Sequence, residues 1–303
     1  MKVFFAVDGS PGSMTAVRQV GQLLSADRDV PALYFAPPEM IVRHAASGED
    51  MHARARQALT DVVFQAAKSQ LPPPLQHKAV PLIAEHTAAE GIRLEAEKWG
   101  AELIVLGARG LTTFESMFLG SVSSAVAQTS TVPVLVVRPD APSAAGRPYR
   151  VLYAFDGSAG STTALSTAEK FTLPAGSEVV AITVIEALTA GDVPEWLMKK
   201  ARDADTEAMS QHWVREHETE KRQACDQLTE FMVKRSGPFQ KAEVICAEGH
   251  AAAQILKIAA ERQVDLVVLG SHGKGMLQRL LIGSTSSKVL NQAHCSVLIA
   301  RGN

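Results

Sequence analysis

The amino-acid sequence contains one pattern twice, and this internal repeat limits the folds open to the chain more than any other feature. Three segments of the first half return in the second half in the same order. Their boundaries are residues 3–10 and 151–158, residues 102–107 and 265–270, and residues 132–137 and 295–300. Because the pairs span nearly the whole chain, the sequence is a duplication of one unit.

The two copies are separated by a segment typical of an exposed linker. Residues 139–148 contain three prolines and mostly small residues, a composition that does not pack into a core. We therefore predict a first domain at residues 1–140, a linker at 141–148 and a second domain at 149–303. The length of 303 residues suits two domains, and a hydrophobic content of 46% lets each build a core.

Composition argues against several classes of protein. The net charge of −2 gives no support for non-specific nucleic-acid binding, which needs clustered Lys and Arg. The sequence has no apolar stretch of about 18 residues to span a membrane, and its N-terminal apolar run is too short for a signal peptide. These observations predict a cytoplasmic protein without nucleic-acid or membrane partners.

The three cysteines, Cys225, Cys246 and Cys295, all lie in the second copy. They have no metal-ligand spacing, and an odd, sparse set fits a reducing compartment better than a disulfide framework. Cys295 opens an apolar strand, so we interpret it as a buried and inert thiol rather than as a nucleophile.

Short apolar runs alternate with longer amphipathic stretches in each copy. The run 103–106 is apolar at every position, which is typical of a strand covered on both faces. In the first copy we predict strands near residues 2–7, 31–36, 77–83, 102–106 and 132–137, and helices near 12–24, 46–69, 87–99 and 120–129. Strands that alternate with helices imply an α/β fold with a parallel sheet and right-handed crossovers. A ligand then binds beyond the carboxyl ends of the strands, where the strand order reverses.

A glycine pattern follows the fourth predicted strand of each copy. In the first copy Gly107 and Gly110 are followed, after nine residues, by the pair Gly120 and Ser121. The second copy repeats this spacing with Gly270, Gly273, Gly283 and Ser284. Glycine allows a positive φ and a close approach of the backbone to a ligand, and the free N–H groups at a helix start suit phosphate. The pattern therefore predicts a phosphate site in each copy, to which both serine hydroxyls contribute.

A second interpretation of the pattern needs no ligand. The glycines would only make turns, and the serines would only cap a helix. The residues between the glycines differ strongly between the copies while the glycines and serines are retained, which favours the phosphate site. Asp8 and Asp156 end the first strand of each copy and fit both interpretations, as ligand-facing carboxylates or as Asx-turns.

The spacing G-x-x-G-x9-G-S, together with Asp-Gly-Ser after the first strand, resembles the universal stress protein family. The resemblance covers both copies, so the whole chain is similar to a tandem universal stress protein. It implies that each copy is a Rossmann-like (adenine nucleotide alpha hydrolase-like) domain with a five-stranded parallel sheet of order 3-2-1-4-5. It also implies binding of ATP, or of AMP or ADP, with Mg²⁺ accompanying ATP, because members with this glycine element generally bind ATP.

The resemblance also assigns the site residue by residue. Phosphate contacts come from the second glycine and the helix start, the first glycine borders the ribose, the aspartate faces the ribose or a metal, and the backbone at the end of the second strand meets adenine. In the first copy these residues are Gly110, Gly120, Ser121, Val122, Gly107, Asp8 and Phe35, with Arg109 in the loop. In the second copy they are Gly273, Gly283, Ser284, Thr285, Gly270, Asp156 and Val184, with His272 in the loop. We expect the side chain of His272 to point to solvent rather than to phosphate.

The first copy departs from the family pattern in two places. Glu115 stands in its loop, whereas the second copy has Lys274 and Arg279 there, and a carboxylate at this point repels a triphosphate. His86 also stands where the second copy has Gly249. We therefore expect the second copy to be the better nucleotide site.

Three hypotheses for the function follow. The first is a nucleotide-binding regulatory protein of stress physiology, in which ATP sets conformation or partnering. The second is an α/β enzyme of related fold with slow or substrate-dependent ATP hydrolysis, and the third is a scaffold that binds no nucleotide. The sequence supplies no positioned general base, no catalytic residue and no metal-ligand cluster, so we expect at most a weak ATPase.

The last strand of each copy is available for assembly. The family resemblance implies pairing through this edge strand, and residues 132–137 and 297–300 can form that pair within one chain. Pairing of whole chains into a homodimer, and binding of another protein, stay open at this point.

The second copy carries an additional long segment. Residues 194–235 lack glycine and internal proline and predict a helix with two packing faces, joined by a charged centre that is solvated or kinked. This segment is either a protruding arm for a partner or a surface helix lengthened without a function of its own.

Overall fold

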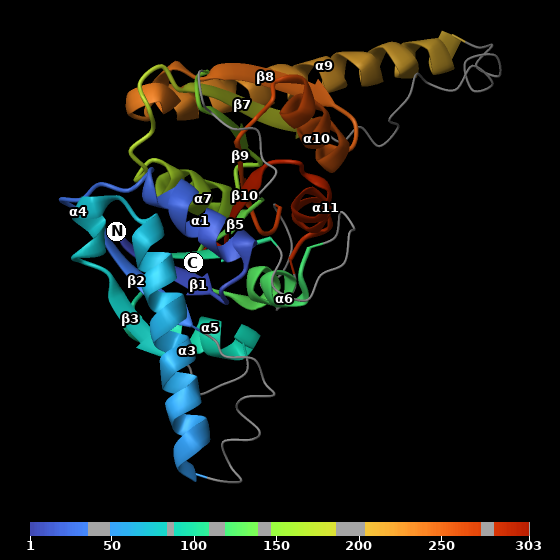
Figure 1. The fold of residues 1–303 in the computed structure, drawn as a ribbon. Helices are drawn as coiled ribbons and strands as arrows, with labels where there is room; N and C mark the ends of the chain where they lie inside the picture. The colour runs from blue at the N-terminus through green and yellow to red at the C-terminus, as the bar shows by residue number, and fades with distance from the viewer. Residues whose placement is uncertain are drawn as a thin grey trace.

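The computed structural model describes residues 1–35, 49–83, 88–108, 119–138, 147–185, 204–273 and 282–302 of the chain. In these ranges, helices flank one sheet that runs through both copies (Figure 1). The first copy contains β1 (Lys2–Val7), α1 (Pro11–Gly21), β2 (Val30–Phe35), α3 (Glu49–Gln70), α4 (Pro73–Gln76), β3 (Val80–Ile83), α5 (Ala88–Trp99), β4 (Leu103–Gly107), α6 (Ser121–Thr129) and β5 (Val134–Val137). The second copy contains β6 (Arg150–Ala154), α7 (Ala159–Ala168), β7 (Glu178–Ile185), α9 (Ala204–Val233), the 3₁₀ helix η1 (Gly237–Lys241), β8 (Glu243–Glu248), α10 (Ala251–Glu261), β9 (Leu266–Gly270), α11 (Ser284–Gln292) and β10 (Ser296–Ala300).

The strand order confirms the predicted topology in both copies. The ten strands lie in the order β3-β2-β1-β4-β5-β10-β9-β6-β7-β8, which is 3-2-1-4-5 in the first half and its mirror order in the second. Pairing within each half is parallel, whereas β5 and β10 pair antiparallel with Leu135 opposite Leu298. The predicted edge-strand pair therefore joins the two copies within one chain, and the two sheets become one mixed sheet.

Two predicted strands of the first copy begin later than expected, and the fifth, expected at residues 132–137, starts at Val134. The third strand was expected near residues 77–83 but starts at Val80, because residues 73–76 form the short helix α4. Two prolines stand at the start of that helix, a position where the missing N–H group of proline costs nothing.

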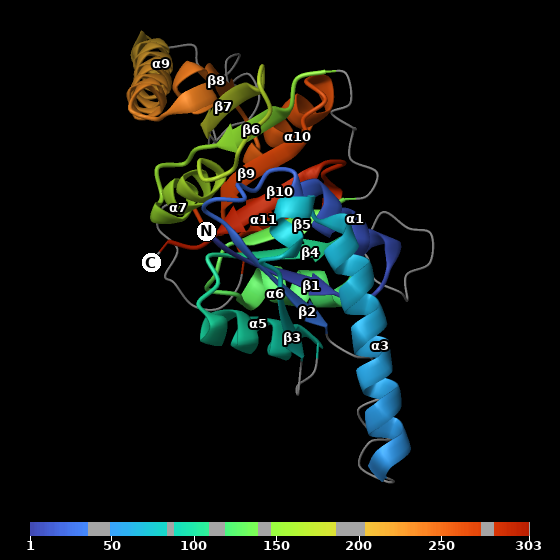
Figure 2. The same ribbon diagram turned by 60° about the vertical axis from the view of Figure 1, so that its left-hand side comes forward.

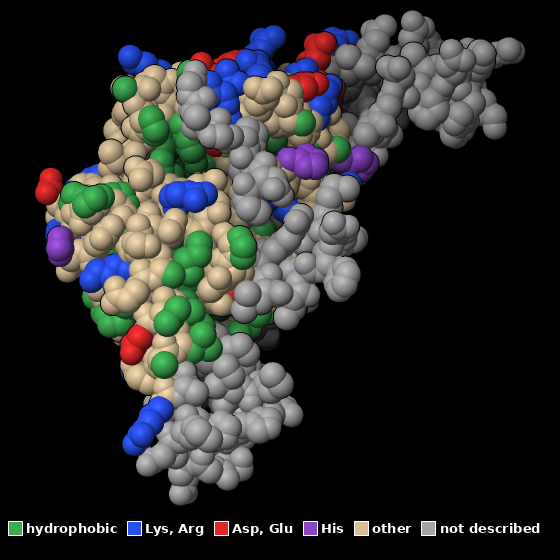
Figure 3. Space-filling model, viewed as in Figure 1, with side chains coloured by type: hydrophobic (Ala, Val, Ile, Leu, Met, Phe, Trp, Pro, Cys, Tyr) green, Lys and Arg blue, Asp and Glu red, His purple; other side chains and the backbone are tan. Residues whose placement is uncertain are grey.

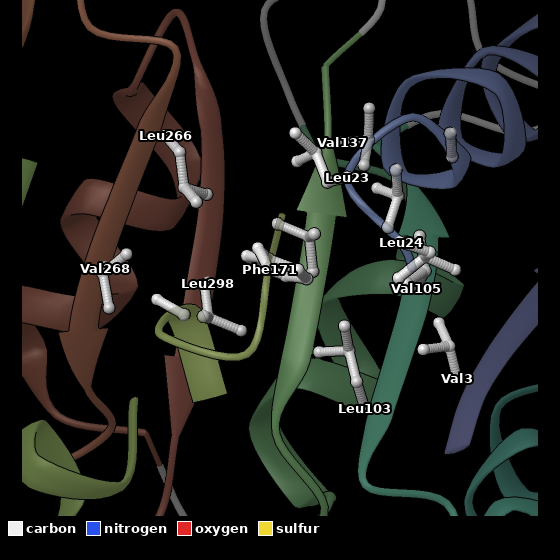
Figure 4. Close-up of a cluster of buried hydrophobic side chains, with 14 of the residues drawn as sticks. Val3, Leu23, Leu24, Leu103, Val105, Val137, Phe171, Leu266, Val268 and Leu298 are labelled. Carbon is white, nitrogen blue, oxygen red and sulfur yellow. The ribbon is translucent and has the colours of Figure 1, made fainter. Parts of the chain in front are cut away.

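Helices cover both faces of the sheet, as the fully apolar strands predict. On one face α1, α3, α7 and α9 contribute buried side chains to a cluster that also contains alternate residues of the strands. The other face is covered in the same way by α5, α6, α10 and α11. Figure 4 shows the first cluster at the joint, where Phe171 of the second copy lies between Leu298 on one side and Leu23, Leu24 and Val105 of the first copy on the other. The two copies therefore share a core as well as a sheet.

Two equivalent arginines, one in each copy, each contact a helix of the other copy. Arg138 follows β5 and donates hydrogen bonds from its guanidinium to the carbonyls of Leu290 (2.9 Å) and Asn291 (3.0 Å) near the end of α11. Arg301 follows β10 and donates to the carbonyl of Gln128 near the end of α6. A cation at a helix C-terminus satisfies free carbonyls and complements the helix dipole. Arg138 is buried, and burial lowers the pKa of Arg301, so both cations are at least partly desolvated and are held by the other copy.

Two long helices extend beyond the sheet, α3 from the first copy and α9 from the second (Figure 1, Figure 2). The charged centre of α9 was expected to be solvated or kinked, and residues 204–233 form one uninterrupted helix. The solvated charged centre is confirmed, since residues 215–222 are mostly exposed, while Leu228 and Met232 farther along are buried. Residues 194–203 of the predicted segment lie outside the described residues.

The cysteines were expected to fit a reducing compartment better than a disulfide framework, yet two of them form a disulfide. Cys225 of α9 and Cys246 of β8 are joined, with their Cα atoms 5.9 Å apart. The helix packs against the strand and thereby brings the two cysteines together, although their spacing in the sequence does not indicate a disulfide. Cys295 is free and buried, as predicted, and burial raises the pKa of its thiol to about 12.

Candidate functional site

The glycine pattern of each copy connects the carboxyl end of a central strand to the start of a helix. Gly107 ends β4 and Gly270 ends β9. A Cβ atom on Gly107 would lie 2.7 Å from the carbonyl carbon of Gly12 in α1, and one on Gly270 would lie 2.6 Å from the backbone nitrogen of Ser161 in α7. Each strand therefore passes the first turn of the neighbouring helix at a distance that only glycine allows.

The last glycine of the pattern is the N-cap residue of a helix. Gly120 precedes α6 and Gly283 precedes α11, and neither provides a capping side chain. The serines at 121 and 284 are the first helical residues, so the alternative in which they cap the helix is wrong. A nine-residue helix in each copy thus starts with backbone N–H groups that no N-cap side chain covers.

A pair of serines that the sequence interpretation did not single out closes the loop. The hydroxyl of Ser123 donates to the carbonyl of Gly107 at 2.7 Å, and that of Ser286 donates to the carbonyl of Gly270 at 2.6 Å. Both serines are buried. They hold the helix start against the strand end, and their recurrence three residues after the last glycine of each copy is the signal that could have revealed them.

The backbone of the loop differs from the expectation in one respect. Gly120 and Gly283 have φ near −62°, so neither uses the left-handed region that glycine was expected to supply. Positive φ values occur instead at Gly9 (84°) and Gly157 (72°), in the turn after the first strand of each copy. Close approach explains Gly283 as it does Gly107 and Gly270: a Cβ on Gly283 would lie 3.0 Å from the carbonyl oxygen of Ser271.

The aspartates after β1 and β6 form Asx-turns. One carboxylate oxygen of Asp8 accepts from the backbone N–H of Ser10 at 2.9 Å, and Asp156 accepts from Ser158 in the same way at 2.9 Å. The second oxygen of Asp156 lies 3.6 Å from the Cβ position of Gly273, the second glycine of the pattern. The turn uses one oxygen, and the other faces the predicted phosphate loop.

Substitutions at Asp156 distinguish a structural role of its carboxylate in the Asx-turn from a role in ligand binding. Asp156→Asn keeps an oxygen that can accept from Ser158 but loses the charge, so we expect a stability within about 0.5 kcal/mol of wild type. Asp156→Ala removes the turn acceptor and is expected to cost roughly 1 kcal/mol. Thermal unfolding checks both values. In nucleotide titrations with and without Mg²⁺, a purely structural role predicts that the asparagine variant binds as wild type does, whereas a ligand role predicts weaker Mg²⁺-dependent binding.

The strand registers correct one residue assignment. Val3 pairs with Pro31 in the first copy, and the equivalent Val151 pairs with Val179 in the second. The residue at the same distance along β7 as Phe35 along β2 is therefore Thr183, one residue before Val184. The side chain of Phe35 is buried, which leaves its backbone as the part that a ligand can meet.

Several predicted site residues cannot be placed. Arg109, Gly110, Glu115, Lys274, Arg279 and His86 lie outside the described residues. His272 is half-buried rather than fully exposed, and its Nδ1 atom lies 2.9 Å from the hydroxyl of the buried Ser271. The first copy has Ala108 in place of Ser271, so the two sites differ in a polar group directly after the strand.

The two candidate sites face opposite edges of the sheet. Because β5 and β10 run antiparallel, the carboxyl ends of the first five strands and of the last five point in opposite directions. Each site is therefore built from one copy. Among the residues that the structure describes, no group of three or more His, Cys, Asp or Glu side chains could hold a metal ion. No helix in the described ranges is long and apolar enough to cross a membrane.

Comparison with known proteins identifies the family. A profile of the universal stress protein family matches residues 1–138 and 149–301. The chain belongs to the universal stress protein family. Both copies are matched, so it is a tandem member, as the repeated glycine element predicted.

Relatives and solved structures agree with this tandem organisation. Universal stress protein Rv1996 of Mycobacterium tuberculosis is 25% identical over 99% of this chain and 94% of its own length. A universal stress protein of Mycolicibacterium smegmatis is 29% identical over 69% of this chain, a match that spans 64% of that relative. The crystal structure of a universal stress protein from Archaeoglobus fulgidus covers 100% of this chain and 98% of its own, with a TM-score of 0.60 and 19% identity, which supports the fold.

Proposed function

We propose that this tandem universal stress protein binds adenine nucleotides, ATP with Mg²⁺ above all, and acts as a regulatory protein whose conformation or partnering depends on the bound nucleotide. The observation that carries the proposal is the start of α6 and of α11. Each helix begins at a glycine without a capping side chain, beside the carboxyl end of a central strand. This is the place where a parallel α/β sheet binds ligands, and a helix start of this kind attracts phosphate.

The residues at the site of the second copy suit a nucleotide phosphate chain. The backbone N–H groups of Ser284 and Thr285 and their hydroxyls are donors at the positive end of α11. A Cβ on Gly283 would lie 3.0 Å from the carbonyl oxygen of Ser271, a tight contact, and glycine at this position leaves the backbone to line the helix start. Asp156 supplies a carboxylate next to Gly273, and Mg²⁺ is commonly held by one carboxylate together with substrate phosphates.

We expect the second copy to bind more tightly than the first. Its loop carries Lys274 and Arg279, where the first copy carries Glu115. A basic side chain near a triphosphate is attractive and a carboxylate is repulsive, by amounts that depend on exposure. Adenine would meet the backbone near Phe35 in the first copy and near Thr183 and Val184 in the second.

The first test is mass spectrometry of the supernatant that acid releases from freshly purified protein. Adenine nucleotide at close to one or two molecules per chain supports the proposal. Titration calorimetry with ATP and Mg²⁺ then gives the affinity and number of sites, and phosphate release over the same period measures any hydrolysis. Absence of nucleotide together with absence of heat contradicts nucleotide binding and favours a scaffold.

A variant at Gly283 assigns the binding to one copy. Gly283→Asp places a carboxylate at the N-cap, where it can accept from the helix N–H groups and repel phosphate, so binding at the second site should weaken by at least about tenfold. Gly283→Ala is the matched control, because it introduces the same Cβ near Ser271 without the charge. Calorimetry should show that the aspartate variant loses the tighter site and that the alanine variant keeps it. Equal binding by both variants and wild type would place the nucleotide elsewhere.

A further inference from the structure

The disulfide of the second copy lies in an exposed seam between two elements. Cys225 belongs to α9, and Cys246 belongs to β8, the last strand in the sheet order, which among the described strands pairs with β7 alone. Both cysteines are partly exposed, in contrast to the buried Cys295. The joined pair is therefore within reach of small thiols in solution, and the third cysteine is not.

The contacts along this seam change in kind at the disulfide. Toward the C-terminal end of α9, Leu228 and Met232 are buried in the core. Toward the N-terminal end, Lys221 Nζ forms an ion pair with Glu248 of β8 at 2.5 Å, and His217 Nε2 lies 3.7 Å from the same carboxylate. Charged side chains gather over this part of the surface (Figure 3). Cys225 stands at the boundary between the two regions.

The ionic part of the seam is weak without the covalent bond. Lys221 and Glu248 are each more than 40% exposed, and exposed ion pairs contribute between zero and about 1 kcal/mol. The hydrogen bond from Lys221 lowers the pKa of Glu248, so the pair is ionised at neutral pH, yet salt screens it. The disulfide is consequently a stronger restraint between α9 and β8 than the pair of Lys221 and Glu248.

We propose that Cys225 and Cys246 form a reversible redox-modification site, which holds α9 against the edge strand β8 when oxidised and releases the part of α9 upstream of Cys225 when reduced. The co-reactant is a low-molecular-weight disulfide such as oxidised glutathione. Two protein thiols and one oxidised glutathione give the protein disulfide and two reduced glutathiones, through a mixed disulfide on one of the two cysteines. The Cα separation of 5.9 Å falls within the range that a disulfide bridges without backbone movement.

Release of α9 has a defined structural consequence. Cys225 and Cys246 have a sequence separation of 21, and the residues of α9 upstream of Cys225 lie outside the loop that their bond closes. Loss of the bond therefore acts on these residues by removing the covalent anchor that holds α9 to β8 at Cys225. The core residues Leu228 and Met232 remain buried, so the fold persists while the seam opens. The proposal concerns only α9 and β8 and holds whether or not either copy binds nucleotide.

Intact-protein mass spectrometry across buffers of oxidised and reduced glutathione tests the chemistry. We expect a reversible loss of two hydrogens in the oxidising buffers, with peptide mapping that assigns the bond to Cys225 and Cys246. Cys295→Ser should behave as wild type, because that thiol is buried. Absence of the bond at every ratio of the two glutathiones, or a bond that reducing buffer cannot open in the folded protein, overturns the proposal.

Hydrogen exchange tests the structural consequence on the wild-type protein in its two redox states. Amides of α9 before Cys225 should exchange faster in the reduced protein, by roughly tenfold or more, while amides around Leu228 and in β6 and β9 stay unchanged. Cys225→Ser and Cys246→Ser should match the reduced wild type in both buffers. Equal exchange of oxidised and reduced wild type in α9 and β8 shows that the bond locks nothing and overturns the proposal without any variant.

Discussion

Addition of a single methyl group at Gly270 is expected to destabilise the protein by about 3 kcal/mol, one of the largest effects that a small substitution can have in this chain. The Cβ atom of Gly270→Ala would lie 2.6 Å from the backbone nitrogen of Ser161 and 3.0 Å from the carbonyl carbon of Gly160. Both neighbours are backbone atoms in the first turn of α7, so the contact cannot be relieved by rotation of a side chain. Either α7 or β9 must move.

The matched control is Gly273→Ala in the same loop. Its Cβ would make an ordinary contact of 3.6 Å with a carboxylate oxygen of Asp156, so we expect a change within about 0.5 kcal/mol. Urea unfolding of the two variants and wild type gives the comparison. The first copy offers an independent repeat, because a Cβ on Gly107 would lie 2.7 Å from Gly12. If Gly270→Ala and Gly273→Ala are equally stable, the close approach of β9 to α7 does not explain the glycine.

This comparison separates two reasons for glycine within one sequence pattern. The first glycine lets a strand pass a helix, and the last one starts a helix without a capping side chain. Substitution of the first should reduce stability, and a carboxylate at the last should reduce binding. A loss of nucleotide binding in Gly270→Ala would therefore carry no information about the ligand unless stability were measured alongside.

The topology could be predicted from the sequence because each local signal agreed with the others. Runs such as residues 103–106 and 266–269 are apolar at every position, and only a strand covered on both faces buries them fully. The duplication then required the same strand order in both halves. Each half ends in an edge strand, at residues 134–137 and 296–300, and pairing of these two strands is the simplest way to join the halves. The helix starts at Ser121 and Ser284 followed from the glycine–serine pairs.

The features that sequence could not supply are contacts between elements far apart in the chain. The hydrogen bonds of Arg138 and Arg301 to the other copy depend on the antiparallel joint, which places each arginine near the end of a helix in that copy. The pairing of Cys225 with Cys246 depends on how α9 lies on β8. Equivalence of Phe35 with Thr183 rather than Val184 depends on strand register, and neighbouring residues in an apolar strand look alike in sequence.

The second large effect is expected at the joint between the copies. Leu135 of β5 and Leu298 of β10 are directly opposite each other and almost completely buried in the same core cluster. Leu135→Ala and Leu298→Ala should each destabilise the protein by about 2–5 kcal/mol, the cost of lost burial plus a cavity. Unfolding should remain one cooperative transition, because the shared core couples the halves.

A double-mutant cycle shows whether the joint is a packed interface or only a tether. Opposite residues on one face of an antiparallel pair have Cβ atoms about 5 Å apart, so their side chains contact each other. The first truncation already removes this contact, and the second truncation cannot remove it again. The double variant should therefore cost less than the sum of the single variants, by about 0.5 kcal/mol or more. Leu152→Ala provides the control: Leu152 lies three strands from β5 on the other face of the sheet, so its effect should add to that of Leu135→Ala within about 0.5 kcal/mol. Additivity between Leu135 and Leu298, or separate melting of the two halves, would mean that the copies fold as independent domains linked by chain alone.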